Sequence, residues 1–234
     1  MADIVQRVPA FLPSTSGLHF VNFYPHEPEL TVTLPLGKTL PIGDAANGLC
    51  GGMVFAATDF YEAKQSVPAD TQPPAAGSPL YEFIVKRLFD SFNLPLGIGR
   101  YLELMEPAFP DVGLGFGLPG RASVMLDDEW PRIKSTLDAG HPAPLGLVKV
   151  KSDQPEDLCK NHQVLAYGYD LHGTDLIIWL YDPNYPDRDD VHIQLSTASS
   201  AVPVPLTYAP PEPLFCFFHT PYTAAAPPTL AAEG

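Results

Sequence analysis

The hydrophobic pattern of this 234-residue chain changes its period near Gly140. Before that glycine, apolar residues recur every three or four positions, which is typical of amphipathic helices. After it, short apolar runs alternate with turn residues, which is typical of strands. The runs are Leu145–Lys151, His162–Tyr169, Leu176–Tyr181, Val191–Leu195 and Leu214–Phe218. Helices in one half and strands in the other predict an α+β fold, with N-terminal helices packed on a C-terminal antiparallel sheet.

Three helices have the clearest signals. The first spans about Leu49 to Lys64, and apolar residues lie on one face at helical spacing. Ser78 is a predicted N-cap with Pro79 at the first helical position of the second helix. Acids at Asp127–Glu129 predict the first turn of another helix. Near the N-terminus, His19–Tyr24 reads as a strand.

The expected domain organisation is one domain with two lobes and loose ends. The start of the chain lacks a clear periodic pattern, and its end is rich in Ala and Pro, which favours fraying. The expected segments are a flexible lead-in over 1–16, a single domain over 17–222 with a helical lobe at about 45–140 and a β lobe at about 141–222, and a disordered tail over 223–234.

Charge and cysteine content limit the partners and the compartment. The chain has 13 Lys and Arg against 27 Asp and Glu, a net charge of −14, so we expect neither nucleic-acid nor membrane partners. Its three cysteines are too few and too odd in number for a disulfide framework, which indicates a reducing compartment. An early acid, Asp3, argues against a secretory signal. The expected location is the cytoplasm, with signal-less secretion left open.

Cys50 lies where a loop of small residues becomes the first helix. A thiol there faces the unpaired N–H groups and the positive dipole end of the first turn, which favour the thiolate. Gly51 and Gly52 follow directly, although glycine is unfavourable inside a helix. Either they leave the sulfur uncovered for a substrate carbonyl, or they permit close packing of helices around a structural cysteine.

A cysteine nucleophile needs a base nearby and a third group that orients the base. His162 begins one predicted strand, and Asp182 directly follows the next. A hairpin turn at Gly173 would bring both residues to the same end of the strand pair. The sequence therefore predicts that Cys50 is a nucleophile, His162 its base and Asp182 the orienting acid.

The order of these motifs resembles the papain-like cysteine peptidase superfamily, and its pattern is closest to the bacteriocin-leader-peptidase branch. The similarity spans roughly 47–184: Cys-Gly at a helix start, His at a strand start, then Tyr-Asp-Pro. The run Gly48 to Met53 also resembles bacterial proteins with the same letters. The resemblance implies a papain-like fold and a thiol hydrolase that cleaves peptide or amide bonds of a peptide or protein substrate through an acyl-enzyme. It assigns Cys50, His162 and Asp182 the roles given above, with Asn184 as a second orienting candidate, because papain-type members use an amide there.

The family's oxyanion donor is a glutamine about six residues before the cysteine. In this chain Asp44 occupies that position, and an ionised carboxylate cannot donate a hydrogen bond. Asn47, or Asn22 from the predicted first strand, would then donate beside the Cys50 backbone N–H. This departure leaves a catalytically silent binding module as an alternative. A thiol acyltransferase or transglutaminase with the same trio is another, and the oligomeric state is left open.

Other motifs are better explained as loops, and no cofactor or metal is expected. Cys159 and His162 have the spacing of half a zinc site, but no second pair lies nearby. Gly115, Gly117 and Gly120 match a dinucleotide fingerprint in letters only, without a strand before them and a helix after them. Acids at 187–190 lack the spacing of a calcium loop.

Overall fold

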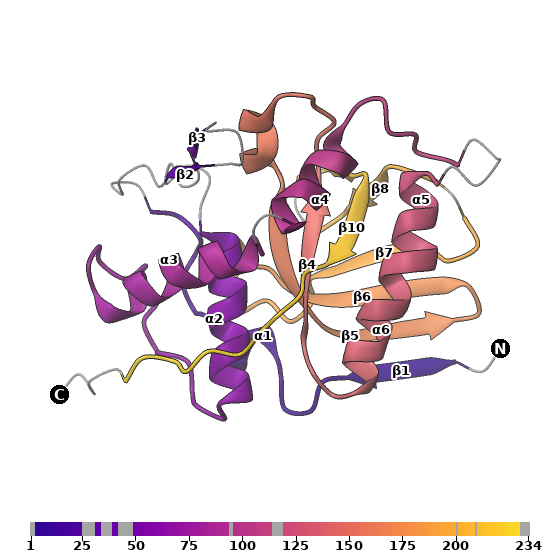
Figure 1. The fold of residues 1–234 in the computed structure, drawn as a ribbon. Helices are drawn as coiled ribbons and strands as arrows, with labels where there is room; N and C mark the ends of the chain where they lie inside the picture. Colours follow the sequence, from indigo (N-terminus) through magenta and orange to yellow (C-terminus); the bar gives the residue numbers. More distant parts are fainter. Residues whose placement is uncertain are drawn as a thin grey trace.

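The computed structural model describes residues 3–24, 31–33, 39–41, 49–93, 96–113, 119–199, 201–208 and 210–229. It is an α+β structure with an antiparallel main sheet, as predicted (Figure 1). The main sheet has the order β10-β4-β5-β6-β7, and β1 also pairs with β5. Its strands are β1 (Ile4–Arg7), β4 (Ala143–Val148), β5 (His162–His172), β6 (Asp175–Tyr181), β7 (His192–Ser196) and β10 (Cys216–His219).

Helices flank this sheet, and two short hairpins lie outside it (Figure 1). In Figure 1, α2 and α3 lie together on the left, and α6 crosses in front of the sheet on the right. The helices are α1 (Pro13–Ser16), α2 (Cys50–Glu62), α3 (Pro79–Ser91), α4 (Leu96–Met105), α5 (Arg121–Ser123), a π-helical stretch (Val124–Glu129), α6 (Trp130–Asp138) and a 3-10 helix (Pro155–Lys160). The hairpins pair β2 (Thr31–Thr33) with β3 (Thr39–Pro41), and β8 (Val204–Leu206) with β9 (Glu212–Leu214). Within the ranges described above, no helix has the length and apolar character to cross a bilayer.

The longest of the described strands, β5, lies in the middle of the main sheet: β4 and β1 pair along one of its edges and β6 pairs along the other. Its first half pairs with β4 along 162–166, and its second half pairs with β1 along 168–171. β4 is buried at all six positions, and the first eight residues of β5 are buried as well. Because both faces of these strands are covered, they read as continuous apolar runs instead of alternating ones.

The two glycines after Cys50 allow α2 and α3 to pack closely. A Cβ at Gly52 would lie 2.1 Å from the carbonyl oxygen of Ile84, and one at Gly51 would lie 2.3 Å from Ser91 Oγ. Residues 51–60 of α2 are all buried, as expected for a helix in the centre of a core. Close helix packing, one of the two explanations considered for these glycines, therefore accounts for them.

The predicted N-cap at Ser78 is confirmed, because its side chain accepts a hydrogen bond from the Tyr81 N–H at 3.3 Å. The helix expected to begin at Asp127–Glu129 begins earlier, because helical structure runs without a gap from Arg121 to Asp138. These acids lie at the end of the π-helical stretch, which connects α5 to α6. Gly140 follows α6 with φ of +84°, a left-handed conformation that ends a helix readily.

The two ends of the chain are more structured than the sequence indicates. Residues 1–16, expected to be a flexible lead-in, contain β1 and α1, because β1 finds its hydrogen bonds on β5, more than 160 residues away. His19–Tyr24 is not a strand: the Phe23 N–H bonds the carbonyl of Val21 in a tight turn. After Tyr222, the expected tail is held at Thr223 and Ala225 by hydrogen bonds to α3 and α2.

Candidate active site

Cys50 is the first residue of α2, as the sequence predicted, and it is partly exposed. Its thiol is hydrogen-bonded to His162 and to the backbone N–H groups of Gln163 and Gly51. Burial by itself raises the pKa of the Cys50 thiol. The charge and hydrogen bond of His162, together with the two N–H groups, outweigh burial, so the pKa lies below its usual value. This environment favours the thiolate.

His162 and Asp182 meet at the end of the β5–β6 hairpin. The two strands pair on either side of the turn at Gly173, with a register shift between Ala166 and Gly168, and His162 Nε2 lies 2.7 Å from Asp182 Oδ1. Both side chains are buried. Because Nε2 contacts Asp182, the other ring nitrogen, Nδ1, is left to face the Cys50 thiol. The three side chains, which we call the triad, thus form one line of contacts.

The charges of the triad support one another. Burial lowers the pKa of His162, but the negative charges of Asp182 and Cys50 outweigh burial and raise it to about 10. Burial raises the pKa of Asp182, but the His162 charge and the hydrogen bonds to the carboxylate bring it below its usual value. At neutral pH these directions favour a thiolate and an imidazolium side by side, with an ionised carboxylate behind them.

Asn22 connects the two halves of the site. Its Oδ1 accepts a hydrogen bond from the Leu49 N–H at 2.6 Å, and its Nδ2 donates to Asn184 Oδ1 at 3.1 Å. Its own N–H donates to the Pro183 carbonyl at 3.0 Å. The Leu49 N–H can only donate, so it fixes which way the Asn22 amide points. Asn22 therefore ties the start of α2 to the turn that follows Asp182.

Three candidates for the orienting or oxyanion role remain: Asn184, Asp44 and Asn47. The backbone N–H of Asn184 donates to Asp182 Oδ1 at 2.9 Å, and its side-chain Oδ1 accepts from Asn22, so Asn184 braces the carboxylate. Asp44 and Asn47 lie outside the described residues. No disulfide bond joins Cys50, Cys159 and Cys216, which all lie in the described residues.

Three residues of the site were missed by the sequence analysis. Tyr208 donates from its hydroxyl to Asp182 Oδ2 at 3.0 Å. Tyr101 donates to the backbone carbonyl of His162 at 2.9 Å, and Gln163 supplies an N–H to the thiol. Gln163 could have been noticed because it follows His162 directly. Nothing in the sequence around Tyr101 or Tyr208 signals a contact with this site.

The described parts of the motifs that read as loops make contacts of other kinds. Across the residues that the structure describes, no group of three or more His, Cys, Asp and Glu side chains could hold a metal ion. Cys159 donates from its thiol to the Glu156 carbonyl. Asp189 accepts two hydrogen bonds from Ser14, and Asp190 pairs with Arg188. Gly115 and Gly117 lie outside the described residues.

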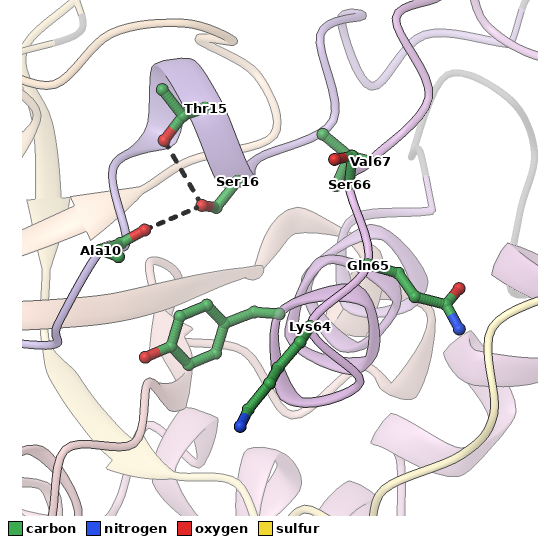
Figure 2. Close-up of a pocket in the computed structure, with 8 residues that line it drawn as sticks. Ala10, Thr15, Ser16, Lys64, Gln65, Ser66 and Val67 are labelled. Atoms are coloured by element: carbon green, nitrogen blue, oxygen red, sulfur yellow. Dashed lines mark hydrogen bonds between the residues drawn. The ribbon is translucent and has the colours of Figure 1, made fainter.

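A separate hollow lies at the other end of α2 (Figure 2). It has a volume of about 340 Å³ and is bordered by Lys64 and Gln65 after the helix and by Thr15 and Ser16 of α1. The helix has 13 residues, so about 20 Å of helix axis separate this hollow from Cys50. None of the triad lines it.

Comparisons of the chain with family models, with curated proteins and with solved structures give no match.

Proposed function

We propose that this protein is a papain-like thiol hydrolase that cleaves peptide or amide bonds, with Cys50 as nucleophile, His162 as general acid and base, and Asp182 as the orienting acid. The observation that carries the proposal is the unbroken line of contacts from the Cys50 thiol through the imidazole to Asp182, at 2.7 Å for the second contact. A nucleophile, a base and an orienting group in this order are the parts that nucleophilic catalysis requires.

The reaction follows from the charges. The Cys50 thiolate attacks the carbonyl carbon, a C–S bond forms, and the carbonyl oxygen becomes negative. The His162 imidazolium then gives its proton to the leaving nitrogen as the C–N bond breaks, which leaves a thioester on Cys50. Neutral His162 next takes a proton from water, the resulting hydroxide attacks the thioester, and the acid product and the thiolate are released. Asp182 holds the ring in place throughout.

The negative oxygen of the intermediate needs donors. The first turn of α2 supplies backbone N–H groups that have no partner within a helix, including that of Cys50. The second candidate is Asn22 Nδ2, which has two hydrogens and gives one to Asn184. Because its amide is fixed by Leu49, Asn22 would donate from a defined position beside the nucleophile.

The surroundings favour a peptide over a phosphorylated substrate. Val21 and Phe23, which flank Asn22, are 47% and 55% exposed and present apolar surface next to the start of α2. Such side chains suit a substrate with apolar residues near the bond that is cleaved. The net charge of −14 disfavours polyanions. A thiol nucleophile and three cysteines that form no disulfide bond are consistent with a reducing compartment such as the cytoplasm.

The test is the rate at which iodoacetamide alkylates each cysteine of the native protein, followed by mass spectrometry from pH 5 to 9. Cys216 is a built-in control, because it is buried and its pKa is raised to about 12. Cys159 is partly exposed and does not belong to the triad. At pH 6.5 we expect Cys50 to react at least about tenfold faster than Cys159, because only the thiolate reacts.

Two controls decide what the result means. His162→Ala should remove the advantage of Cys50, since it removes the positive charge beside the thiol. Equal rates at Cys50 and Cys159 in the wild-type protein would overturn the proposal. If Cys50 reacts fast but a peptidyl electrophile does not label it, the silent binding module is favoured. Product analysis with an added amine separates transfer to the amine from hydrolysis.

A further inference from the structure

Tyr208 closes the side of Asp182 that faces away from His162. The carboxylate uses Oδ1 for His162 Nε2 and the Asn184 N–H, and it uses Oδ2 for the Tyr208 hydroxyl at 3.0 Å. Asp182 is 2% exposed, so little water can reach it. A buried carboxylate oxygen needs a hydrogen-bond donor, and among the described residues the Tyr208 hydroxyl supplies one to Oδ2.

The phenol is a permanent donor. Burial and the negative charge of Asp182 raise the pKa of Tyr208 far above its usual value, so the hydroxyl keeps its proton across the whole pH range of the protein. A hydrogen bond from a neutral donor stabilises the ionised form of the carboxylate that accepts it. Tyr208 therefore favours Asp182 as an anion.

Contacts around Tyr208 fix its position. It lies between β8 and β9, the hairpin outside the main sheet, and Glu212 of β9 forms an ion pair with Lys149 just after β4. Its ring meets that of Tyr185 edge to face, with centroids 5.7 Å apart. Arg188 donates to its backbone carbonyl at 3.4 Å. The hydroxyl is therefore held at Oδ2 from several directions.

We propose that Tyr208 is a positioning residue of the site, which keeps Asp182 ionised and aligned and thereby keeps His162 charged and Cys50 a thiolate. This inference rests on the proposed function, because it concerns the charge state of the same triad. Tyr208 does not contact the thiol. Its influence passes through the carboxylate to the imidazole and from there to the sulfur.

The test is the pH dependence of Cys50 alkylation in Tyr208→Phe. The substitution keeps the ring and removes the donor, so the pKa of Asp182 should rise and that of His162 should fall. The thiolate then loses part of its stabilisation. We expect the midpoint of the alkylation profile to move to higher pH by up to about one unit, the size expected for one lost hydrogen bond to an ionised group. The rates should converge with wild type at high pH.

Tyr222→Phe is the matched control. It removes a tyrosine hydroxyl from a different buried carboxylate, Asp59, which Tyr222 contacts at 2.6 Å. Its alkylation midpoint should stay at the wild-type value even if its stability falls. In an Asp182→Asn background, Tyr208→Phe should move the midpoint no further, because its route through the carboxylate is gone.

The outcomes are distinct. An unchanged midpoint in folded Tyr208→Phe, checked by circular dichroism, overturns the positioning role while leaving the proposed function intact. A wild-type Cys50 that reacts no faster than Cys159 overturns the proposed function itself. If the Phe variant does not fold, Tyr208→Leu removes the donor in its place, and a midpoint shifted up supports the role. An unchanged midpoint in the folded Leu variant contradicts it.

Discussion

Two buried carboxylates in this protein have nearly the same set of partners. Asp182 accepts from a tyrosine hydroxyl, a backbone N–H and a cation, which are those of Tyr208, Asn184 and His162. Asp59 likewise accepts from Tyr222, from the Ala225 N–H and from the guanidinium of Arg87.

The cation makes the difference between the two sites. A guanidinium group is a permanent cation, whereas an imidazole gains and loses a proton near neutrality. Burial raises the pKa of Asp59 in spite of its donors, while the pKa of Asp182 lies below its usual value because the His162 charge outweighs burial. The same kinds of donor thus have different effects. At Asp59 they hold the C-terminal segment on α2, and at Asp182 they support a charged imidazole beside a thiol.

The largest expected effect is on the structural site. Arg87→Ala leaves Asp59 buried without its cation, so the free energy of unfolding should fall by about 3–5 kcal/mol. Arg87 also lies over the ring of Phe55, with its guanidinium carbon 4.9 Å from the centroid, and that contact is lost as well. Urea unfolding followed by circular dichroism measures the change.

Arg132→Ala is the control for this prediction. The Arg132 side chain is 65% exposed and pairs with Glu129 at 3.5 Å, so its loss should change stability by less than about 0.5 kcal/mol. A loss below about 1 kcal/mol for Arg87→Ala would show that the two carboxylate sites do not differ in the way described.

The sequence predicted the part of the site that is local in the chain. His162 and Asp182 lie on one hairpin, and Gly173, with φ of +63°, supplies the turn that brings them together. The helix start at Cys50 was equally readable, because small residues precede a periodic apolar run.

The missed part comes from distant segments that carry no motif. Tyr208 reaches Asp182 from a hairpin outside the main sheet. Asn22 was named as a candidate, but the turn that brings it to Leu49 read as a strand. Likewise β1 is a strand only because β5 offers hydrogen bonds across more than 160 residues. Such contacts depend on tertiary packing. Secondary-structure propensity and hydrophobic periodicity describe only local sequence, so they do not predict these contacts.

A smaller effect is expected when one donor is removed from Asp59. Tyr222→Phe loses a hydrogen bond to a carboxylate, which should lower the free energy of unfolding by about 1.5–3 kcal/mol. The segment after Tyr222 should then exchange its amide hydrogens faster, starting with Ala225, whose N–H bonds the same carboxylate. Hydrogen exchange with mass spectrometry measures this. Unchanged exchange at Ala225 would mean that Asp59 holds the segment without help from Tyr222.

The smallest effect for a one-unit change of pH separates the two carboxylate sites by the protons of their cations. In the wild-type protein, folded Cys50 and His162 together carry one proton on the imidazole. Between pH 6.5 and 9.0, the usual pKa values of the two groups, the unfolded chain also carries one, on the thiol. The pair therefore adds no pH dependence to stability in this window.

Cys50→Ala should uncover the contribution of His162. Asp182 still raises the pKa of the imidazole, so the folded variant binds a proton that the unfolded chain lacks above pH 6.5. Stability relative to wild type should then fall with rising pH, by about 1.4 kcal/mol per unit at most, until the pH passes the folded pKa of His162. Urea unfolding at pH 6.5, 7.5 and 8.5 measures the slope, with Cys159→Ala as control. Parallel profiles for Cys50→Ala and wild type would mean that Asp182 alone does not keep His162 charged. The charge of the imidazole would then depend on the thiolate.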